Sequence, residues 1–415
     1  MQQARPIGYF ASPWPCEDGG PRRVQAPHGI AGLGVTAEEK LVAVSRDAPG
    51  STMVVLREPG EVFVQGLAFG TETTAWVEQI DPESLETRRR SLDLPGGPFW
   101  PGGIAVHANG DLYVTYGRWC HRLAPDLTVV AARELPQPRP YNSLLILDSG
   151  HLVMKDFIMD GSAVSHLVVL DPERLEPVGP EIAVPEGSIA RLSADGDFLY
   201  VIGDHTAFRY SWDATRLTLE RDESWTVPYR TLDDQSFGWD PVIEGGHVWW
   251  MDNGEHTWSG SLRDGGVAPG PSHLVRASVS DASDFELVEV SGLPHGVIVN
   301  PPLFDEQRRI AVAYDSGNGV VCGLRFNGPG SLEPIWLREL GQGMHMLHFP
   351  DTGEVVVGDH GPDGEHAVVL DIATGETRGR VATGSRVQSV VFPSPGWNRD
   401  FYTSTFTTLT RVFVE

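Results

Sequence analysis

Residues 139–157 read RPYNSLLILDSGHLVMKDF, and this stretch contains two short apolar runs separated by a turn. Residues 144–147 and 151–154 are strand-like, and the Asp-Ser-Gly between them is a typical hairpin turn. Asn142 stands before the first run, and Asp156 follows the second. The stretch therefore predicts an antiparallel pair of strands with polar groups at one end.

Similar hairpins recur along the chain. They begin at Gly102, Asn142, Ser188, Asp240, His295, His345 and Gln388, at intervals of 40 to 55 residues. A second hairpin, such as SHLVVLDPERLEPVGPEIAV (165–184), follows in each unit and brings the number of strands to four. Units of this length with several strands are typical of β-propellers. The sequence predicts an all-β fold, a single β-propeller over residues 1–415 with four-stranded blades and almost no helix.

The number of blades follows from the number of units. Seven units are clear, and we expect an eighth to begin near Ala31, before GLGVTAEEKLVAVSR (32–46). We therefore predict eight blades, with seven as the alternative, because residues 46–73 do not fit the repeat and would then be an insertion. The last unit has room for only three strands. We expect a strand from the N-terminus, residues 22–26 (RRVQA), to join the C-terminal strands and close the ring.

The composition limits the partners. The chain has 56 acidic and 31 basic residues and a formal net charge of -25, so neither nucleic acid nor an anionic membrane is an expected partner. Three cysteines, Cys16, Cys120 and Cys322, lie far apart and indicate incidental thiols in a reducing compartment. The first residues lack the apolar core of a signal peptide, and no run reaches transmembrane length. We expect a cytoplasmic protein that acts on a small molecule.

Polar residues are expected where the innermost strands begin, at the mouth of the propeller channel. His295 and His345 are candidates for general acid and base, together with Asp240. The candidate metal ligands are Asn142, Asp240, His295 and His345. They would hold a divalent metal ion, Ca²⁺, Mg²⁺, Mn²⁺, Zn²⁺ or Fe²⁺, and no spacing motif selects among these. The alternative is that these side chains only meet water in the channel.

Aromatic and further polar residues stand near the same positions. Trp100 and Trp239 are candidates for an aromatic wall that binds a ring-shaped substrate, with packing between sheets as the alternative. His205, His360 and Gln388 complete the predicted substrate-binding set. The long, Gly-rich stretch 253–272 (NGEHTWSGSLRDGGVAPGPS) has the length of a lid over this face.

Acidic residues end the second strand of several units, and we interpret them as caps of the following turns. These residues are Asp156, Asp204, Asp252, Asp315 and Asp359. Asp81 and Asp171, within IDPE and LDPE, are expected to hold turns on the opposite face.

Two stretches resemble a known family. RPYNSLLILDSGHL (139–152) resembles the Asn-bearing strand of the gluconolactonase and senescence-marker (regucalcin) propellers, and GWDPVIEGGHVWW (238–250) resembles their Asp-bearing strand. The resemblance implies that Asn142 is a metal ligand and that Asp240 is both a ligand and a base of a lactone hydrolase. This sequence departs from that family, since Ser188 stands near the expected second Asn and the units exceed six.

Two other stretches, PGGIAVHANGDLYVTYG (101–117) and PHGVIV (294–299), resemble the repeats of virginiamycin B lyase. That propeller has seven blades and uses Mg²⁺ and a His. Together the matched stretches cover about a quarter of the chain.

Three functions remain open. The first is a metal-assisted hydrolase of the lactonase or esterase type, or a lyase, in which the cation polarises a carbonyl and a His transfers protons. The second is a non-catalytic binding or scaffold propeller. The third is a His-ligated iron oxygenase of the carotenoid-cleaving type, for which His205, His295, His345 and His360 would have to converge. Convergence of the polar side chains on one point distinguishes the enzymes from the scaffold.

Overall fold

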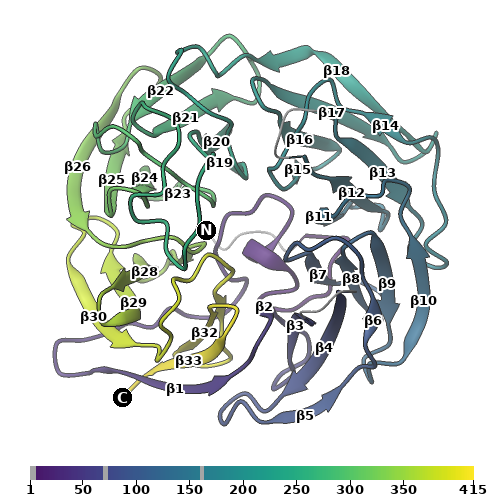
Figure 1. Ribbon diagram of the computed structural model, residues 1–415, viewed down its shortest axis with the longest axis horizontal. Helices are drawn as coiled ribbons and strands as arrows, with labels where there is room; N and C mark the ends of the chain where they lie inside the picture. The colour runs from purple at the N-terminus through teal and green to yellow at the C-terminus, as the bar shows by residue number, and fades with distance from the viewer. Residues whose placement is uncertain (1–5, 69–72, 159–162) are drawn as a thin grey trace.

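Eight antiparallel sheets stand around a central channel in the computed structural model, which describes residues 6–68, 73–158 and 163–415 (Figure 1). Each sheet is a four-stranded blade, and the first blade carries a fifth, two-residue strand. The helical content of the described residues is one three-residue 3-10 helix, η1 (Glu17–Gly19). The predicted all-β propeller is confirmed, and it has eight blades rather than seven.

The blades follow one another in chain order, and each runs from its innermost to its outermost strand. Blade 1 contains β2 (Ser51–Leu56), β3 (Val62–Ala68), β4 (Thr74–Ile80) and β5 (Thr87–Arg90), with β6 (Leu94–Pro95) beside β4. Blade 2 contains β7 (Gly103–Val106), β8 (Leu112–Tyr116), β9 (Trp119–Leu123) and β10 (Val129–Glu134). Blade 3 contains β11 (Tyr141–Ile146), β12 (Leu152–Asp156), β13 (His166–Leu170) and β14 (Ile182–Ala183). Blade 4 contains β15 (Ser193–Asp195), β16 (Phe198–Ile202), β17 (Ala207–Asp213) and β18 (Thr218–Val227).

The remaining blades repeat this arrangement. Blade 5 contains β19 (Val242–Glu244), β20 (His247–Met251), β21 (His273–Ser278) and β22 (Phe285–Glu289). Blade 6 contains β23 (Leu303–Asp305), β24 (Ile310–Asp315), β25 (Val320–Phe326) and β26 (Leu332–Glu339). Blade 7 contains β27 (Leu347–Phe349), β28 (Glu354–Gly361), β29 (Gly364–Asp371) and β30 (Thr377–Ala382). Blade 8 contains β31 (Ser394–Pro395), β32 (Asp400–Ser404), β33 (Thr408–Val414) and β1 (Leu41–Asp47).

Burial explains the two kinds of strand in each blade. Inner strands such as β2 (STMVVL) and β24 (IAVAYD) are buried along their whole length, because both faces pack against neighbouring blades. The outermost strands face solvent. All four residues of β5 (TRRR) are exposed, and charged side chains on such an edge oppose pairing with another chain.

The ring closes through the N-terminus, but not through the predicted segment. β1 pairs antiparallel with β33 and becomes the outermost strand of blade 8, as Figure 1 shows beside the C-terminus. Residues 22–26 form no strand. The predicted start of the eighth unit near Ala31 is also wrong. The inner strands β2 and β3 of blade 1 come from residues 51–68, within the range considered as an insertion.

Residues 6–29, which we call the plug, run through the channel instead, at the centre of the ring in Figure 1. The inner strands have one edge toward the channel, and the plug supplies partners for that edge. Its carbonyl groups accept hydrogen bonds from the amides of five inner strands, β2, β7, β15, β19 and β27, contributed by Leu56, Val106, Ala194, Ile243 and His348. The plug therefore belongs to the core of the fold.

The plug backbone is held in a strained shape by its side chains. Asp18, Arg23 and Gln25 have φ of 56°, 53° and 58°, in the left-handed region that non-glycine residues rarely adopt. Each of these side chains is buried and paired. The amide of Gln25, for example, donates to the carbonyl of Pro302 and accepts from the amide of Met346. These contacts offset the cost of the backbone conformation.

Two further observations concern the cysteines and the helical segments. Cys16, Cys120 and Cys322 are free and buried. Within residues 6–68, 73–158 and 163–415, no helix is long and apolar enough to cross a membrane.

Arg23→Met tests the plug. The guanidinium of Arg23 is 1% exposed and pairs with Glu17 and Asp18, so its loss takes one cationic partner from each of two buried carboxylates. We expect the free energy of unfolding to fall by about 3–5 kcal/mol, measured by urea titration. Arg88→Met, which breaks an exposed ion pair with Asp81, is the matched control and should cost about 0–1 kcal/mol. Equal effects of the two variants would contradict the role of the plug.

Candidate functional site

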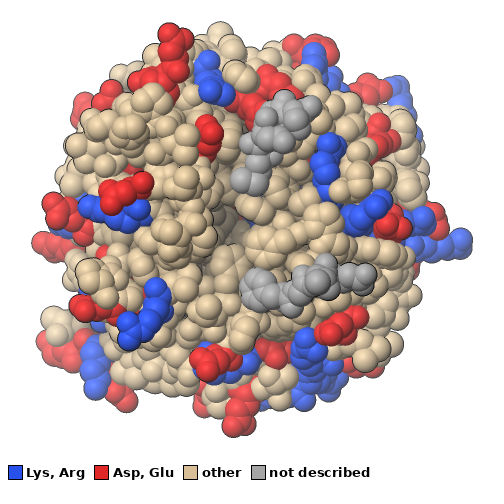
Figure 2. All heavy atoms as spheres, viewed as in Figure 1, with Lys and Arg blue, Asp and Glu red and all other residues tan. Residues whose placement is uncertain are grey.

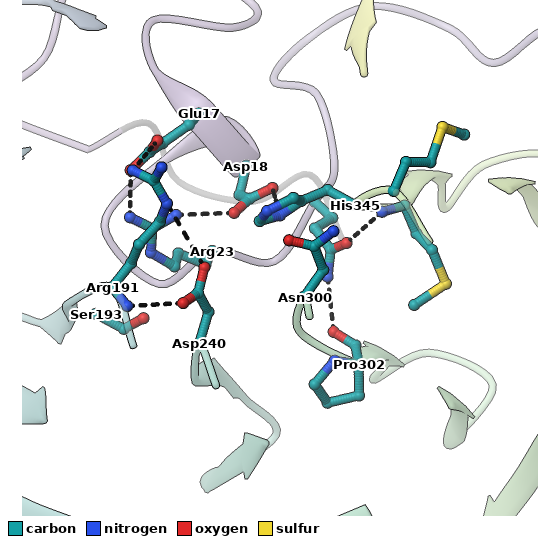
Figure 3. A network of polar contacts seen from close by, with 12 residues as sticks. Glu17, Asp18, Arg23, Arg191, Ser193, Asp240, Asn300, Pro302 and His345 are labelled. Carbon is teal, nitrogen blue, oxygen red and sulfur yellow. Dashed lines mark hydrogen bonds and ion pairs between the residues drawn. The ribbon is translucent and has the colours of Figure 1, made fainter. Parts of the chain in front are cut away.

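A buried network of charged side chains joins the plug to the blades (Figure 3). Glu17, Asp18 and Arg23 come from the plug, and Arg191, Asp240 and His345 come from the segments that lead into blades 4, 5 and 7. Nη1 of Arg23 lies 2.8 Å from Oδ2 of Asp18, and Nη2 contacts Glu17. Nη1 of Arg191 lies 2.9 Å from Oε2 of Glu17. All six side chains are almost fully buried, so each charge depends on its partners.

Asp240 and Asn142 are part of this structural network. Oδ1 of Asp240 accepts the backbone N–H of Arg191 at 2.7 Å, and Oδ2 lies 3.8 Å from Nε of the same residue. The side chain of Asn142 donates to the carbonyl of Ile189, and the backbone carbonyl of Asn142 accepts from Nη1 of Arg191. Asp240 therefore faces a guanidinium where a metal ion was predicted.

His345 forms a carboxylate–imidazole pair with the plug. Its Nδ1 lies 3.0 Å from Oδ1 of Asp18. Burial raises the pKa of Asp18, but His345 and Arg23 more than offset this, so the pKa lies below its ordinary value. Because Asp18 is held as a carboxylate, Nδ1 of His345 donates the proton, and the ring orientation is set.

A cavity of about 430 Å³ opens above this network at the mouth of the channel. Six aromatic side chains line it: Phe99, Trp100, Trp239, Trp258, Phe392 and Phe406. Arg191, His256, Asn300 and His345 are its polar lining residues. Figure 2 shows the hollow near the centre of this face, surrounded mostly by atoms that are neither acidic nor basic. The cavity has the size and lining of a small-molecule site.

The aromatic walls are packed against one another. The rings of Trp100 and Trp239 lie 6.2 Å apart, and Trp100 lies 4.4 Å from Phe157. Trp239 also donates from Nε1 to the carbonyl of Gly254 at 3.3 Å. A side chain at Gly254 would collide with that indole, so glycine is required for this placement. Both tryptophans predicted to bind substrate thus line the cavity.

Stretch 253–272 crosses the mouth of the channel and contributes His256, Trp258 and Leu262 to the cavity. It is tethered on the far side by Gln388. The amide N–H of Leu262 donates to Oε1 of Gln388 at 2.7 Å, and the backbone N–H of Gln388 donates to the carbonyl of Gly260 at 3.0 Å. Gln388 was predicted to bind substrate, but its side chain is engaged in this tether and in a bond to the carbonyl of Gly341.

The predicted histidines are not brought together. His295 is exposed and does not line the cavity, so the structure does not place it with His345 in one site. His205 is exposed beside Arg230, and Nδ1 of His360 lies 3.3 Å from Glu365. The four histidines required by an iron oxygenase therefore have separate surroundings.

The residues present do not fit the predicted metal site. In the part of the chain that the structure describes, no three His, Cys, Asp or Glu side chains are grouped as a metal ion requires. The predicted ligands are engaged elsewhere, since Asp240 pairs with Arg191 and His345 pairs with Asp18. We derive no chemical step through a metal ion.

His295 was misplaced because the sequence alignment set the start of its inner strand too early. Arg191, Asp240, His345 and Phe392 each stand two residues before an innermost strand. The hairpin alignment used Ser188 and His295, but the strands β15 and β23 begin later, at Ser193 and Leu303. Arg191 from blade 4 and Asn300 from blade 6 are the polar residues that reach the cavity from these two blades. The start of each inner strand, shortly after Arg191 and Asn300, is the sequence signal that would have identified these two residues.

The predicted capping of the following turn is seen at Asp315, which accepts the backbone N–H of Asn318. Asp156, Asp252 and Asp359 bond instead to segments farther along the chain or before them. Carboxylate oxygens of Asp156, Asp252, Asp315 and Asp359 each accept a backbone N–H of a neighbouring segment. Asp204 differs, because burial, with Glu186 nearby, raises its pKa to about 6. Asp81 and Asp171 hold their turns by accepting two and three backbone N–H groups, respectively.

Glu365 in β29 is buried behind the segment that carries Gln388. Burial raises the pKa of its carboxyl to about 7 from an ordinary value of 4.5, and His360 opposes this shift only in part. The folded protein therefore binds more protons than the unfolded chain between about pH 4.5 and 7. The contribution of Glu365 to the free energy of unfolding therefore falls as the pH rises through this window.

Glu365→Gln should remove that loss, because glutamine does not ionise. We expect the variant to gain on the order of 3 kcal/mol relative to the original protein on going from pH 4 to pH 8, measured by urea titration at each pH. Glu333→Gln, at an exposed position in β26, is the matched control and should show no such gain. A pH-independent difference between Glu365→Gln and the original protein would show that the carboxyl does not titrate in this range.

Comparisons with known proteins support the propeller fold but identify no chemistry. The sequence matches no protein-family model and no curated protein. The quinohemoprotein alcohol dehydrogenase of Comamonas testosteroni is similar in structure, with a TM-score of 0.64, 11% identity, and coverage of 99% of this chain and 81% of that one. A quinohemoprotein alcohol dehydrogenase of Pseudomonas putida HK5 has a TM-score of 0.62 at 10% identity, covering 99% and 80%.

A third similar structure is the Dos1 propeller, with a TM-score of 0.58, 9% identity, and coverage of 91% of this chain and 95% of that one. At such identities the likeness shows the fold alone. The resemblance to gluconolactonase and virginiamycin B lyase propellers is supported only as far as the β-propeller architecture, which this chain builds from eight blades.

Proposed function

We propose that this propeller binds a flat, largely apolar small molecule in the cavity at the mouth of its channel. The observation that carries the proposal is the meeting of six aromatic side chains around one hollow of about 430 Å³. They come from segments near blades 1, 2, 5 and 8, so the ring fold is needed to bring them together. Flat rings gain both apolar burial and stacking in such surroundings.

Polar groups at the floor of the cavity would orient the ligand. Arg191 and Asn300 offer hydrogen-bonding groups, and His345 offers Nε2, because its Nδ1 is engaged by Asp18. A few fixed polar groups among apolar walls are typical of small-molecule sites. The ion network behind them keeps these groups in place before the ligand arrives, which lowers the cost of binding.

A flat ligand is also compatible with the fold relatives. Two of them are named quinohemoprotein alcohol dehydrogenases, and the name refers to quinone and haem groups, which are flat rings. The proposal itself rests on the lining of this cavity. The alternative, a scaffold propeller that binds a protein at its rim, gives no reason for an aromatic hollow at the channel mouth.

A second candidate function is acid–base catalysis on the bound molecule, as in the hydrolase or lyase expected from the sequence. The favouring observation is the 3.0 Å pair of His345 and Asp18 at the cavity floor. A buried carboxylate that holds Nδ1–H leaves Nε2 of the imidazole to accept or return a proton. This role needs His345 and Asp18 only, and Asp240 and His295 have no part in it.

Trp239→Leu tests the binding function. A panel of naphthalene derivatives of different charge serves as probes, and binding is read from tryptophan fluorescence and titration calorimetry. We expect at least one derivative to bind, and Trp239→Leu to weaken it five- to tenfold because a stacking wall is lost. Trp212→Leu, far from the cavity in β17 of blade 4, is the control and should leave the affinity unchanged. Failure of the whole panel to bind would overturn the proposal.

His345→Gln tests the catalytic candidate. With 2-naphthyl acetate as a model ester, kcat/KM should fall about 100-fold or more in the variant, because the general base is removed. Affinity for neutral 2-naphthamide should change less than threefold, since the aromatic walls remain. Hydrolysis that is absent in the original protein, or equal in the variant, would contradict the catalytic role and leave the binding function in place.

A further inference from the structure

Arg191 is the one permanently charged side chain in the described lining of the cavity, and its charge is positive. Arg191, His256 and His345 are its ionisable members, and the described lining includes no carboxylate. This contrasts with the chain as a whole, in which 56 acidic residues outnumber 31 basic ones. A random sample of this protein's charged residues would be mainly acidic, so the composition of the cavity requires an explanation.

The carboxylates of the ion network lie behind the basic groups. Glu17, Asp18 and Asp240 are at most 3% exposed and are absent from the lining. Each contacts a basic group that does reach the cavity, Glu17 and Asp240 through Arg191 and Asp18 through His345. Figure 3 shows the two sets of side chains facing each other. The basic members of these pairs therefore lie at the cavity surface, and the pairs of Arg191 act there as fixed dipoles with the positive end toward the cavity.

Arg191 retains a donor for a ligand. Its Nη1 is taken by Glu17 and by the carbonyl groups of Gly102 and Asn142, and its Nε lies near Asp240. No hydrogen bond from Nη2 to a described residue is present. The guanidinium stacks 4.7 Å from the ring of Phe392, and the imidazole of His345 lies 3.8 Å from the same ring. Phe392 thus holds both basic groups beside one apolar surface.

We infer that the ligand of this cavity is an aromatic carboxylate, with its ring against the tryptophans and its carboxylate toward Nη2 of Arg191 and toward the Nε2–H that His345 presents when its imidazole is protonated. This inference rests on the proposed binding function and adds the class of ligand. Guanidinium-to-carboxylate hydrogen bonds are among the strong ones in proteins, and the apolar walls strengthen them by excluding water. Phe392 would confine the carboxylate to the floor of the cavity.

A cationic ligand is the main rival, because aromatic walls also bind cations and the protein is acidic overall. Arg191 decides against it. A second cation beside a buried guanidinium meets like charge in a region of low dielectric, which disfavours its binding. The acidic surface outside acts at longer range and is screened by salt.

Three isosteric probes test the class of ligand: 2-naphthoate, neutral 2-naphthamide and the cation 2-naphthylmethylammonium. Calorimetric affinities are measured for the full chain at one pH and ionic strength. We expect 2-naphthoate to bind at least tenfold more tightly than 2-naphthamide, and the cation to bind most weakly. Arg191→Lys and His345→Gln, which keep the charge and the bond to Asp18 respectively, should each reduce the acid-to-amide ratio below threefold.

Arg263→Lys is the matched control, since Arg263 is an exposed arginine in stretch 253–272 that does not line the cavity, and it should leave the ratio unchanged. Melting curves identify any variant that fails to fold. If either Arg191→Lys or His345→Gln does not fold, the other variant still tests the inference. Equal affinities for acid and amide, or tightest binding of the cation, would overturn the inference while the binding function stands. Binding of none of the three would overturn both.

Discussion

The buried ion network between plug and blades is the constraint on which the channel depends. Arg23 and Arg191 bring two guanidinium groups into the centre of the ring, and Glu17, Asp18 and Asp240 surround them. Removing each such charge from water costs several kcal/mol, and only well-placed ionic and hydrogen-bonding partners offset that cost. The plug must therefore sit in one position, and the blades that carry Arg191, Asp240 and His345 must face it in one register.

That constraint also shapes the cavity. The plug fills the channel below the ion network and leaves a hollow at the mouth, where the aromatic side chains gather. The network is its floor, and it presents basic groups upward while their carboxylate partners stay below. A site that is assembled in this way before a ligand arrives needs little rearrangement to bind one.

The propeller supplies rigid positions, and the connecting segments supply the chemistry. Inner strands buried on both faces hold the segments that precede them, which is why Arg191, His345 and Phe392 reach the centre from equivalent positions in three blades. Structures with the same fold and about 10% identity include named dehydrogenases and the Dos1 propeller. Fold and function separate easily in such a scaffold, because the function depends on a few side chains at one mouth.

The sequence by itself determined the propeller, its four-stranded blades and the turns held by Asp81 and Asp171, because each strand and each turn depends on a short local pattern. Eight blades were predicted with seven as the alternative, and only the structure located the blade that starts at Ser51. The sequence also indicated which end of the blades to examine, and the structure places Trp100 and Trp239 there. The plug, the ring closure by β1 and the pairing of Asp240 with Arg191 were decided only by the tertiary structure. Asp18 and His345 are 327 positions apart, and Arg23 reaches a carbonyl 169 positions away. Burial can be inferred from local apolarity, but the partner of a charged side chain depends on which distant segment the fold brings beside it.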